Sequence, residues 1–242
     1  MRKKLKRMNK YKLKSLISYL LCAIAFSFFS VSVQAKPGDQ IRYLPVQDSG
    51  RIKPFDTFAA ETLEIIYGKK YYKFDSASEA VPAHWVVLTW MLAPESWVSR
   101  PLFEVKHFDV LKNLGLSKEK KYFTGDELFK SEKFANSMQE LANKRESKEK
   151  LTPYFQALQR LENQFFIFRE MASGRLLHVL PKKDSDDWFS VAELPAEIQP
   201  SFIELSKNVA QYLGAIADKS NSTAYGDNLD KSVLTFQEQA TK

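Results

Sequence analysis

Cysteine is nearly absent from this sequence: the single cysteine, Cys22, lies near the N-terminus, and residues 36–242 contain none. That part of the chain therefore cannot form a disulfide, relay electrons through thiols, bind a metal through cysteine or attach haem covalently at a Cys-x-x-Cys-His motif. Its stability must come from a hydrophobic core. With 44% hydrophobic residues in a chain of 242, the sequence can supply such a core.

Acidic residues are absent from the first 35 residues, which hold eight lysines and arginines. Residues 36–242 carry 28 cations and 29 anions, so the net charge of +7 belongs to the N-terminal segment. Because proteins that bind nucleic acid concentrate positive charge to neutralise phosphates, this near-balance argues against a nucleic-acid partner.

The N-terminal cations precede an apolar run over residues 16–33, and small residues, Val33 and Ala35, follow at the −3 and −1 places of a cleavage site. This pattern is typical of a signal peptide over residues 1–35. An uncleaved signal anchor is the alternative, because about 18 apolar residues approach the length that spans a bilayer. In either case the positive flank stays inside. We therefore expect residues 36–242 in the periplasm, at the extracytoplasmic face of the inner membrane.

Glycine is scarce, with eight in the chain, and apolar residues recur at helical spacing. The pattern predicts a mainly α fold: one helical domain over residues 36–242 with one or two short strands and a charged linker near residues 143–150. Helices are expected at residues 55–67, from about 76 or from Pro82 to 92, and at 124–143, 152–173, 200–218 and 229–239, and Thr124 is expected to cap the third of them. Extended segments are expected at residues 101–105 and 175–180. The helices at 55–67 and 81–92 are expected to form the core.

The signatures of common enzyme classes are also absent. The sequence has no Gly-x-Gly-x-x-Gly, no phosphate-binding loop and no Gly-x-Ser-x-Gly. None of the histidines His84, His107 and His178 lies three or four residues from another, so no helical pair of metal ligands exists. We expect no enzymatic activity and no metal site.

The most informative stretch is Leu44 to Thr57, which reads LPVQDSGRIKPFDT. Asp48-Ser49-Gly50 is typical of a turn, and Pro54 favours extended backbone before it. Arg51 and Lys53 then lie beside the start of a helix, where free backbone amides and the helix dipole favour an anion such as a carboxylate or phosphate. The alternative is that both cations pair with Asp48, Asp56 or another carboxylate and only pin a strand to the helix.

Residues 45–59 resemble the motif at the head of an extracytoplasmic region in cytochrome c biogenesis proteins of the CcsA/ResC type, which deliver haem to apocytochromes c outside the cytoplasm. Four later segments resemble the same region in order and approximate spacing: residues 94–97 with 101–102, 114–116, 188–190 and 193–194. The resemblance thus covers about residues 41–195. The transmembrane haem-handling core of that family, with its tryptophan-rich segment, has no counterpart after residue 35, so the synthase chemistry is not expected here.

The resemblance implies a membrane-associated accessory module that works beside a membrane haem-lyase subunit and positions haem or apocytochrome c. A haem propionate or the partner would meet Gln47, Asp48, Gly50, Arg51, Lys53, Asp56 and Thr57, with His84 and His107 as weak candidates for haem ligands. No resident cofactor is expected, haem being at most a transient cargo. The alternative function is a generic exported helical scaffold or interaction domain unrelated to cytochrome c.

Overall fold

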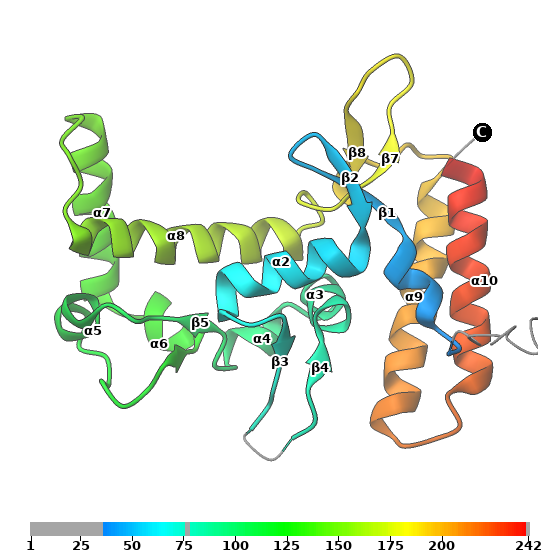
Figure 1. Cartoon of the computed structure of the whole chain (residues 1–242), viewed down its shortest axis with the longest axis horizontal. Coiled ribbons are helices and arrows are strands. Elements are labelled where there is room, and N and C mark those ends of the chain that lie inside the picture. Colours follow the sequence, from blue (N-terminus) through cyan, green and yellow to red (C-terminus); the bar gives the residue numbers. More distant parts are fainter. Residues whose placement is uncertain (1–35, 76–77, 241–242) are drawn as a thin grey trace, which may run out of the picture. The chain divides into compact units, whose positions relative to one another are not determined.

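The computed structural model describes residues 36–75 and 78–240 (Figure 1). The signal peptide or anchor expected at residues 1–35 lies outside the described residues, and so does Ser76, near which one helix start was expected. Residues 37–242 make up one compact unit. None of the helices in the described part of the chain combines the length and the apolar character that a membrane crossing requires.

The described residues are mainly helical, as predicted. The α-helices are α2 (Phe55–Tyr67), α3 (Ala83–Leu92), α4 (Glu95–Val98), α5 (Phe108–Leu114), α6 (Gly125–Phe129), α7 (Glu132–Glu146), α8 (Pro153–Ala172), α9 (Gln199–Ala217) and α10 (Thr223–Ala240). Two 3₁₀ helices are η1 (Asp39–Tyr43) and η2 (Val191–Glu193). The strands are β1 (Pro45–Asp48), β2 (Arg51–Pro54), β3 (Tyr71–Tyr72), β4 (Val81–Pro82), β5 (Phe103–Glu104), β6 (Tyr122–Phe123), β7 (His178–Pro181) and β8 (Trp188–Ser190).

Helix α2 has the predicted boundaries. Pro54 stands at its N-cap in extended conformation, and the first backbone amide, that of Phe55, donates to the carbonyl of Leu44 at 2.8 Å. Gly68 ends the helix with φ 71°, in the left-handed region that favours glycine. Helix α3 begins at Ala83 directly after Pro82, which confirms the later of the two expected starts.

Three boundaries differ from the prediction. The single helix expected at residues 124–143 is two helices, because Ser131 starts a second one by accepting a hydrogen bond from the amide of Phe134. The first, α6, begins with the expected cap, in which Thr124 and Glu127 bond each other's backbone amides. Helix α7 then runs to Glu146, so the charged linker is shorter than expected, and α10 begins at Thr223 rather than near residue 229.

The number of strands was underestimated: the described residues contain eight, where one or two were expected. Strands β1 and β2 form an antiparallel hairpin, and β7 joins it through the pairing of Gln47 with His178, giving a sheet of order β2-β1-β7-β8. The hairpin turn has positive φ at Ser49 and Gly50, 52° and 73°, as in a type I′ turn. Strands of two to four residues are too short for an alternating pattern to be recognised in a sequence.

The core lies among α2, α3 and α8, which contact one another. Its largest fully buried side chain is Trp90 of α3, whose ring meets Phe168 of α8 edge to face. Helices α9 and α10 lie side by side as a helical pair, and α10 contacts η1 (Figure 1). The N-terminal segment thus links this pair to the rest of the unit.

Two glycines with the same backbone conformation allow a matched test of packing. A Cβ at Gly68 would lie 2.6–2.8 Å from the carboxylate of Glu104, whereas a Cβ at Gly50 would have no atom within 4 Å. We expect Gly50→Ala to lower the free energy of unfolding by about 1 kcal/mol, from left-handed strain alone, and Gly68→Ala by roughly 1.5–2 kcal/mol, because the carboxylate at the end of the Glu104 side chain must also move away. Urea unfolding of both variants measures the difference, and equal losses would contradict the prediction.

Candidate functional site

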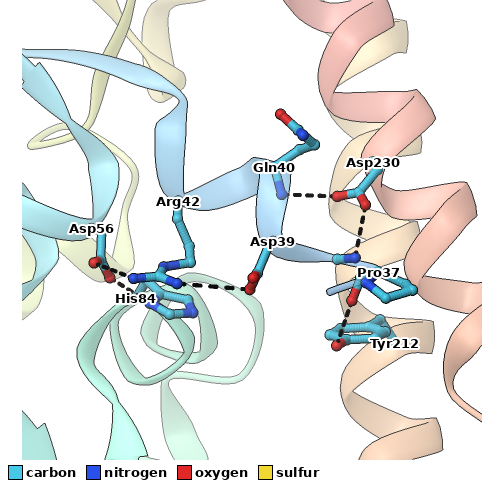
Figure 2. A network of polar contacts seen from close by, with 9 residues as sticks. Pro37, Asp39, Gln40, Arg42, Asp56, His84, Tyr212 and Asp230 are labelled. Carbon is cyan, nitrogen blue, oxygen red and sulfur yellow. Dashed lines mark hydrogen bonds and ion pairs between the residues drawn. The ribbon is translucent and has the colours of Figure 1, made fainter. Parts of the chain in front are cut away.

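The N-terminal segment that begins the described fold is held by a network of polar contacts from four helices (Figure 2). The carboxylate of Asp230, on α10, accepts hydrogen bonds from the backbone amides of Gly38 and Gln40, both at 2.9 Å. The hydroxyl of Tyr212, on α9, donates to the carbonyl of Pro37 at 2.9 Å. Helices α9 and α10 therefore fix the backbone just before and within η1.

The other side of the same segment is bonded to α2 and α3. Arg42, in η1, donates to Asp56 of α2 at 3.0 Å and lies 3.9 Å from Asp39. His84 of α3 places its Nδ1 2.7 Å from the second oxygen of Asp56. Asp56 thus joins three elements that are distant in the sequence, and Figure 2 shows its carboxylate bonded to both Arg42 and His84.

Burial and hydrogen bonding together set the protonation states of His84 and Asp56 in this network. The side chain of His84 is 4% exposed, and its burial lowers the pKa of the imidazole. The hydrogen bond to Asp56 raises this pKa, but the effect of burial is larger. Burial by itself would raise the pKa of Asp56, but the hydrogen bonds from Arg42 and His84 outweigh it and the pKa is lowered. A neutral imidazole therefore donates a hydrogen bond from its Nδ1–H to an ionised carboxylate, whose charge Arg42 balances.

Most residues of the predicted binding motif form internal contacts. The side-chain amide of Gln47 donates to the carbonyl of Asp186, and its oxygen accepts from the amide of Trp188, so Gln47 ties β1 to the β7–β8 hairpin. Lys53 bonds Asp48 at 2.8 Å and Glu61 of α2 at 2.6 Å. For Lys53 this is the expected alternative, in which a cation of the motif pins strand to helix, whereas Asp56 pairs with Arg42 and His84 and with neither cation of the motif.

Arg51 is the exception. It is exposed on β2, where its backbone pairs with Asp48, and within residues 36–75 and 78–240 its side chain has no hydrogen bond, ion pair or ring contact. The next residue, Ile52, is 65% exposed. Gly50 has open space around it, and Thr57 is exposed on α2. The two cations of the motif therefore do not converge on the start of α2: Lys53 turns to Glu61, and Arg51 faces solvent.

The two histidines that were weak candidates for haem ligands lie in different places. His84 is buried and bonded to Asp56, which favours its structural interpretation. His107 is the N-cap of α5 and lines a groove of ≈ 1270 Å³ along α8, where its Nδ1 is buried without a partner. Among the described residues, no three His, Cys, Asp or Glu side chains gather as a metal site would need.

No protein-family model matches the chain, and no curated protein matches it. The resemblance of residues 45–59 to cytochrome c biogenesis proteins thus stays a prediction from the sequence.

Sequence reasoning missed the residues that organise this network. Asp230 is separated from Gly38 by 192 residues and Tyr212 from Pro37 by 175, and no local pattern links positions so far apart. Only the spacing of Asp39 and Arg42, three residues apart, could have indicated a local ion pair.

The Asp230 contacts predict a measurable stability difference. Asp230→Ala removes the acceptor of two backbone amides, and we expect a loss of about 2–3 kcal/mol in the free energy of unfolding, with a smaller loss for Asp230→Asn, which keeps one acceptor oxygen. Asp227→Ala, on an exposed position of the same helix, is the control and should change stability by less than about 0.5 kcal/mol. Urea unfolding measures all three; a loss in the control as large as in Asp230→Ala would refute the interpretation.

His84 predicts a dependence of stability on pH. In the unfolded chain a histidine has a pKa near 6.5, while burial lowers the pKa of His84 in the fold, so the unfolded state binds the proton first as pH falls. We expect the free energy of unfolding to fall as pH drops below about 6.5 and to keep falling toward the lowered pKa. Asp56 does not contribute in this window, because its pKa is lowered by the hydrogen bonds from Arg42 and His84 and an aspartate already titrates below this window in the unfolded chain.

His84→Gln, which keeps a donor for Asp56, should remove this part of the pH dependence. Urea unfolding between about pH 8 and about pH 5 compares the variant with the wild type. An equal slope of stability against pH in both proteins would mean that another group is responsible.

Proposed function

We propose that this chain is an accessory extracytoplasmic module of cytochrome c biogenesis. It works beside a CcsA-type membrane haem lyase, without catalysing a reaction, and helps to position haem or the apocytochrome. The observation that carries the proposal is the solvent-facing end of the β1–β2 hairpin, where Arg51 has no partner within the described chain and Ile52 is 65% exposed. This end belongs to the stretch that resembles the family.

Arg51 is the best placed residue of the motif to contact an anion. Lys53 and Asp56 already have partners of opposite charge, so contacting a ligand would require breaking those pairs. The guanidinium of Arg51 can hold a carboxylate, including a haem propionate, through two parallel hydrogen bonds. An apolar neighbour such as Ile52 adds contact area, and burying it on binding is favourable.

The hairpin holds Arg51 in a defined position. Its tight turn has two residues with positive φ, Gln47 ties β1 to the neighbouring hairpin, and Lys53 ties β2 to α2. Fewer side chains and less backbone must then be ordered when the partner binds, which lowers the entropic cost of association. The signal sequence expected at residues 1–35 would bring this hairpin to the periplasmic side, where cytochromes c mature.

The role of Arg51 predicts a separation of function from stability. Arg51→Ala should leave the free energy of unfolding within about 0.5 kcal/mol of the wild type, because the side chain has no internal partner. It should nevertheless reduce haem-stained cytochrome c, since losing a charge-assisted contact weakens binding by roughly ten- to a hundred-fold. Arg51→Lys should also be impaired, because an ammonium cannot bind a carboxylate with two parallel bonds.

Lys53→Ala is the matched control on the same strand. It removes the ion pairs to Asp48 and Glu61, so it should lower stability by about 1 kcal/mol and reduce cytochrome c only as far as it reduces the amount of folded protein. The experiment measures protein abundance and cytochrome c together. Unchanged cytochrome c after deletion of the whole protein would overturn the proposal and favour an exported scaffold unrelated to cytochrome c.

A further inference from the structure

Positive charge is concentrated in two segments of an otherwise acidic chain. Residues 68–73 and 100–123 together hold nine lysines and arginines against three acids, whereas the rest of residues 36–242 holds 19 cations against 26 anions. In a nearly neutral domain, such a separation of charges produces a positively charged surface where the two segments lie together in space.

The two segments do meet, at the C-terminal end of α2. The ring of Tyr67 stacks on that of Tyr122, with centroids 4.2 Å apart. Gly68 lies so close to Glu104 that a Cβ there would be 2.6 Å from its carboxylate. Helix α2 contacts both β3 and β5, which Figure 1 shows near its end.

A single carboxylate organises the lysines at this junction. The side chain of Glu104 is 8% exposed, and its oxygens lie 2.6 Å from Nζ of Lys106 and 2.9 Å from Nζ of Lys121. The two lysine side chains remain 68% and 51% exposed. One buried negative charge thus holds two positive charges at the surface, which leaves the junction net positive.

Three exposed aromatic rings on or beside these segments each have a cation over their face. The rings of Tyr71, Phe74 and Phe108 are 40%, 50% and 55% exposed. The distances from the cation to the ring centroid are 5.7 Å for Lys69 and Tyr71, 4.7 Å for Arg100 and Phe74, and 4.4 Å for Lys118 and Phe108. We call these three pairs, with Lys106 and Lys121, the basic face.

We propose that the basic face binds the headgroup region of a membrane that contains anionic phospholipids. Each pair presents an apolar ring and a positive group side by side, which matches the boundary where lipid phosphates and the first acyl carbons lie within a few ångströms of each other. Aromatic rings are enriched at this depth, and each lysine or arginine near an anionic surface adds to the attraction.

A bilayer accounts for the arrangement better than an acidic peptide does. The three pairs lie on different elements: Tyr71 on β3, Phe74 after it, and Phe108 at the start of α5. An acidic peptide would neutralise the cations but would leave the three separate rings exposed. A bilayer surface is broad enough to contact pairs on different elements, with phosphates for the cations and acyl chains for the rings.

Vesicle co-sedimentation tests the proposal with residues 36–242, which contain the whole compact unit and omit the apolar leader, itself a lipid binder. Cooperative thermal unfolding first verifies that this part is folded. We expect binding to vesicles of phosphatidylglycerol and phosphatidylcholine, no binding to phosphatidylcholine alone, and weaker binding as salt is raised. Failure to bind the anionic vesicles would overturn the proposal.

Two charge-matched triple variants locate the surface. Lys69→Gln with Arg100→Gln and Lys118→Gln should weaken vesicle binding on the order of 100-fold. The control, Lys144→Gln with Arg169→Gln and Lys182→Gln, removes three cations that also lie over aromatic rings but outside the basic face. The control should bind vesicles like the wild type, and an equal loss in both variants would show attraction by net charge alone.

Two further measurements separate the alternatives. Replacing Tyr71, Phe74 and Phe108 by serine leaves the charge unchanged and should abolish the binding that persists at high salt, because that part depends on inserted rings. Poly-glutamate serves as the competing probe. If it binds the wild type but not the basic-face variant while anionic vesicles bind neither, the partner is an acidic peptide and the membrane proposal is wrong. None of these readouts depends on cytochrome c.

Discussion

Two carboxylates on opposite sides of residues 37–43 fix this segment between the α9–α10 pair and helices α2 and α3. Asp230 accepts the backbone amides of Gly38 and Gln40 on one side, and Asp56 pairs with Arg42 on the other. Between these contacts Ile41 is buried, with 1% of its surface exposed. The short N-terminal segment thus connects the α9–α10 pair to α2 and α3, and each contact is strong because a charge takes part in the hydrogen bond.

The same contacts decide which charged residues around the first hairpin remain free. Asp56 is committed to Arg42 and His84, and Lys53 to Asp48 and Glu61. A chain without cysteine after residue 22 has only packing, hydrogen bonds and ion pairs to fix such a hairpin. The outcome is a rigid support that leaves Arg51 at the surface, where a partner can reach it without disturbing the fold.

Charge is used in two different ways in this domain. In the network of Asp56 and Asp230, carboxylates satisfy buried or half-buried donors and so define the arrangement of helices. On the basic face, the buried Glu104 holds Lys106 and Lys121, whose side chains stay 68% and 51% exposed, near the surface, and three further cations lie over exposed rings. The proposed hairpin contact and the proposed lipid contact therefore fall on separate parts of the chain and can be tested independently.

The sequence by itself determined the helical class, the extent of α2 between Pro54 and Gly68, the cap of α6 at Thr124, and the turn at Ser49 and Gly50. Each of these depends on residues within one or two helical turns, where propensity and capping act. Only the tertiary structure decided which charged residues of the motif are free, that Asp230 binds Gly38, and that residues 68–73 meet residues 100–123. Those contacts join positions far apart in the chain, and they form because packing of the core brings the elements together, which no local pattern records.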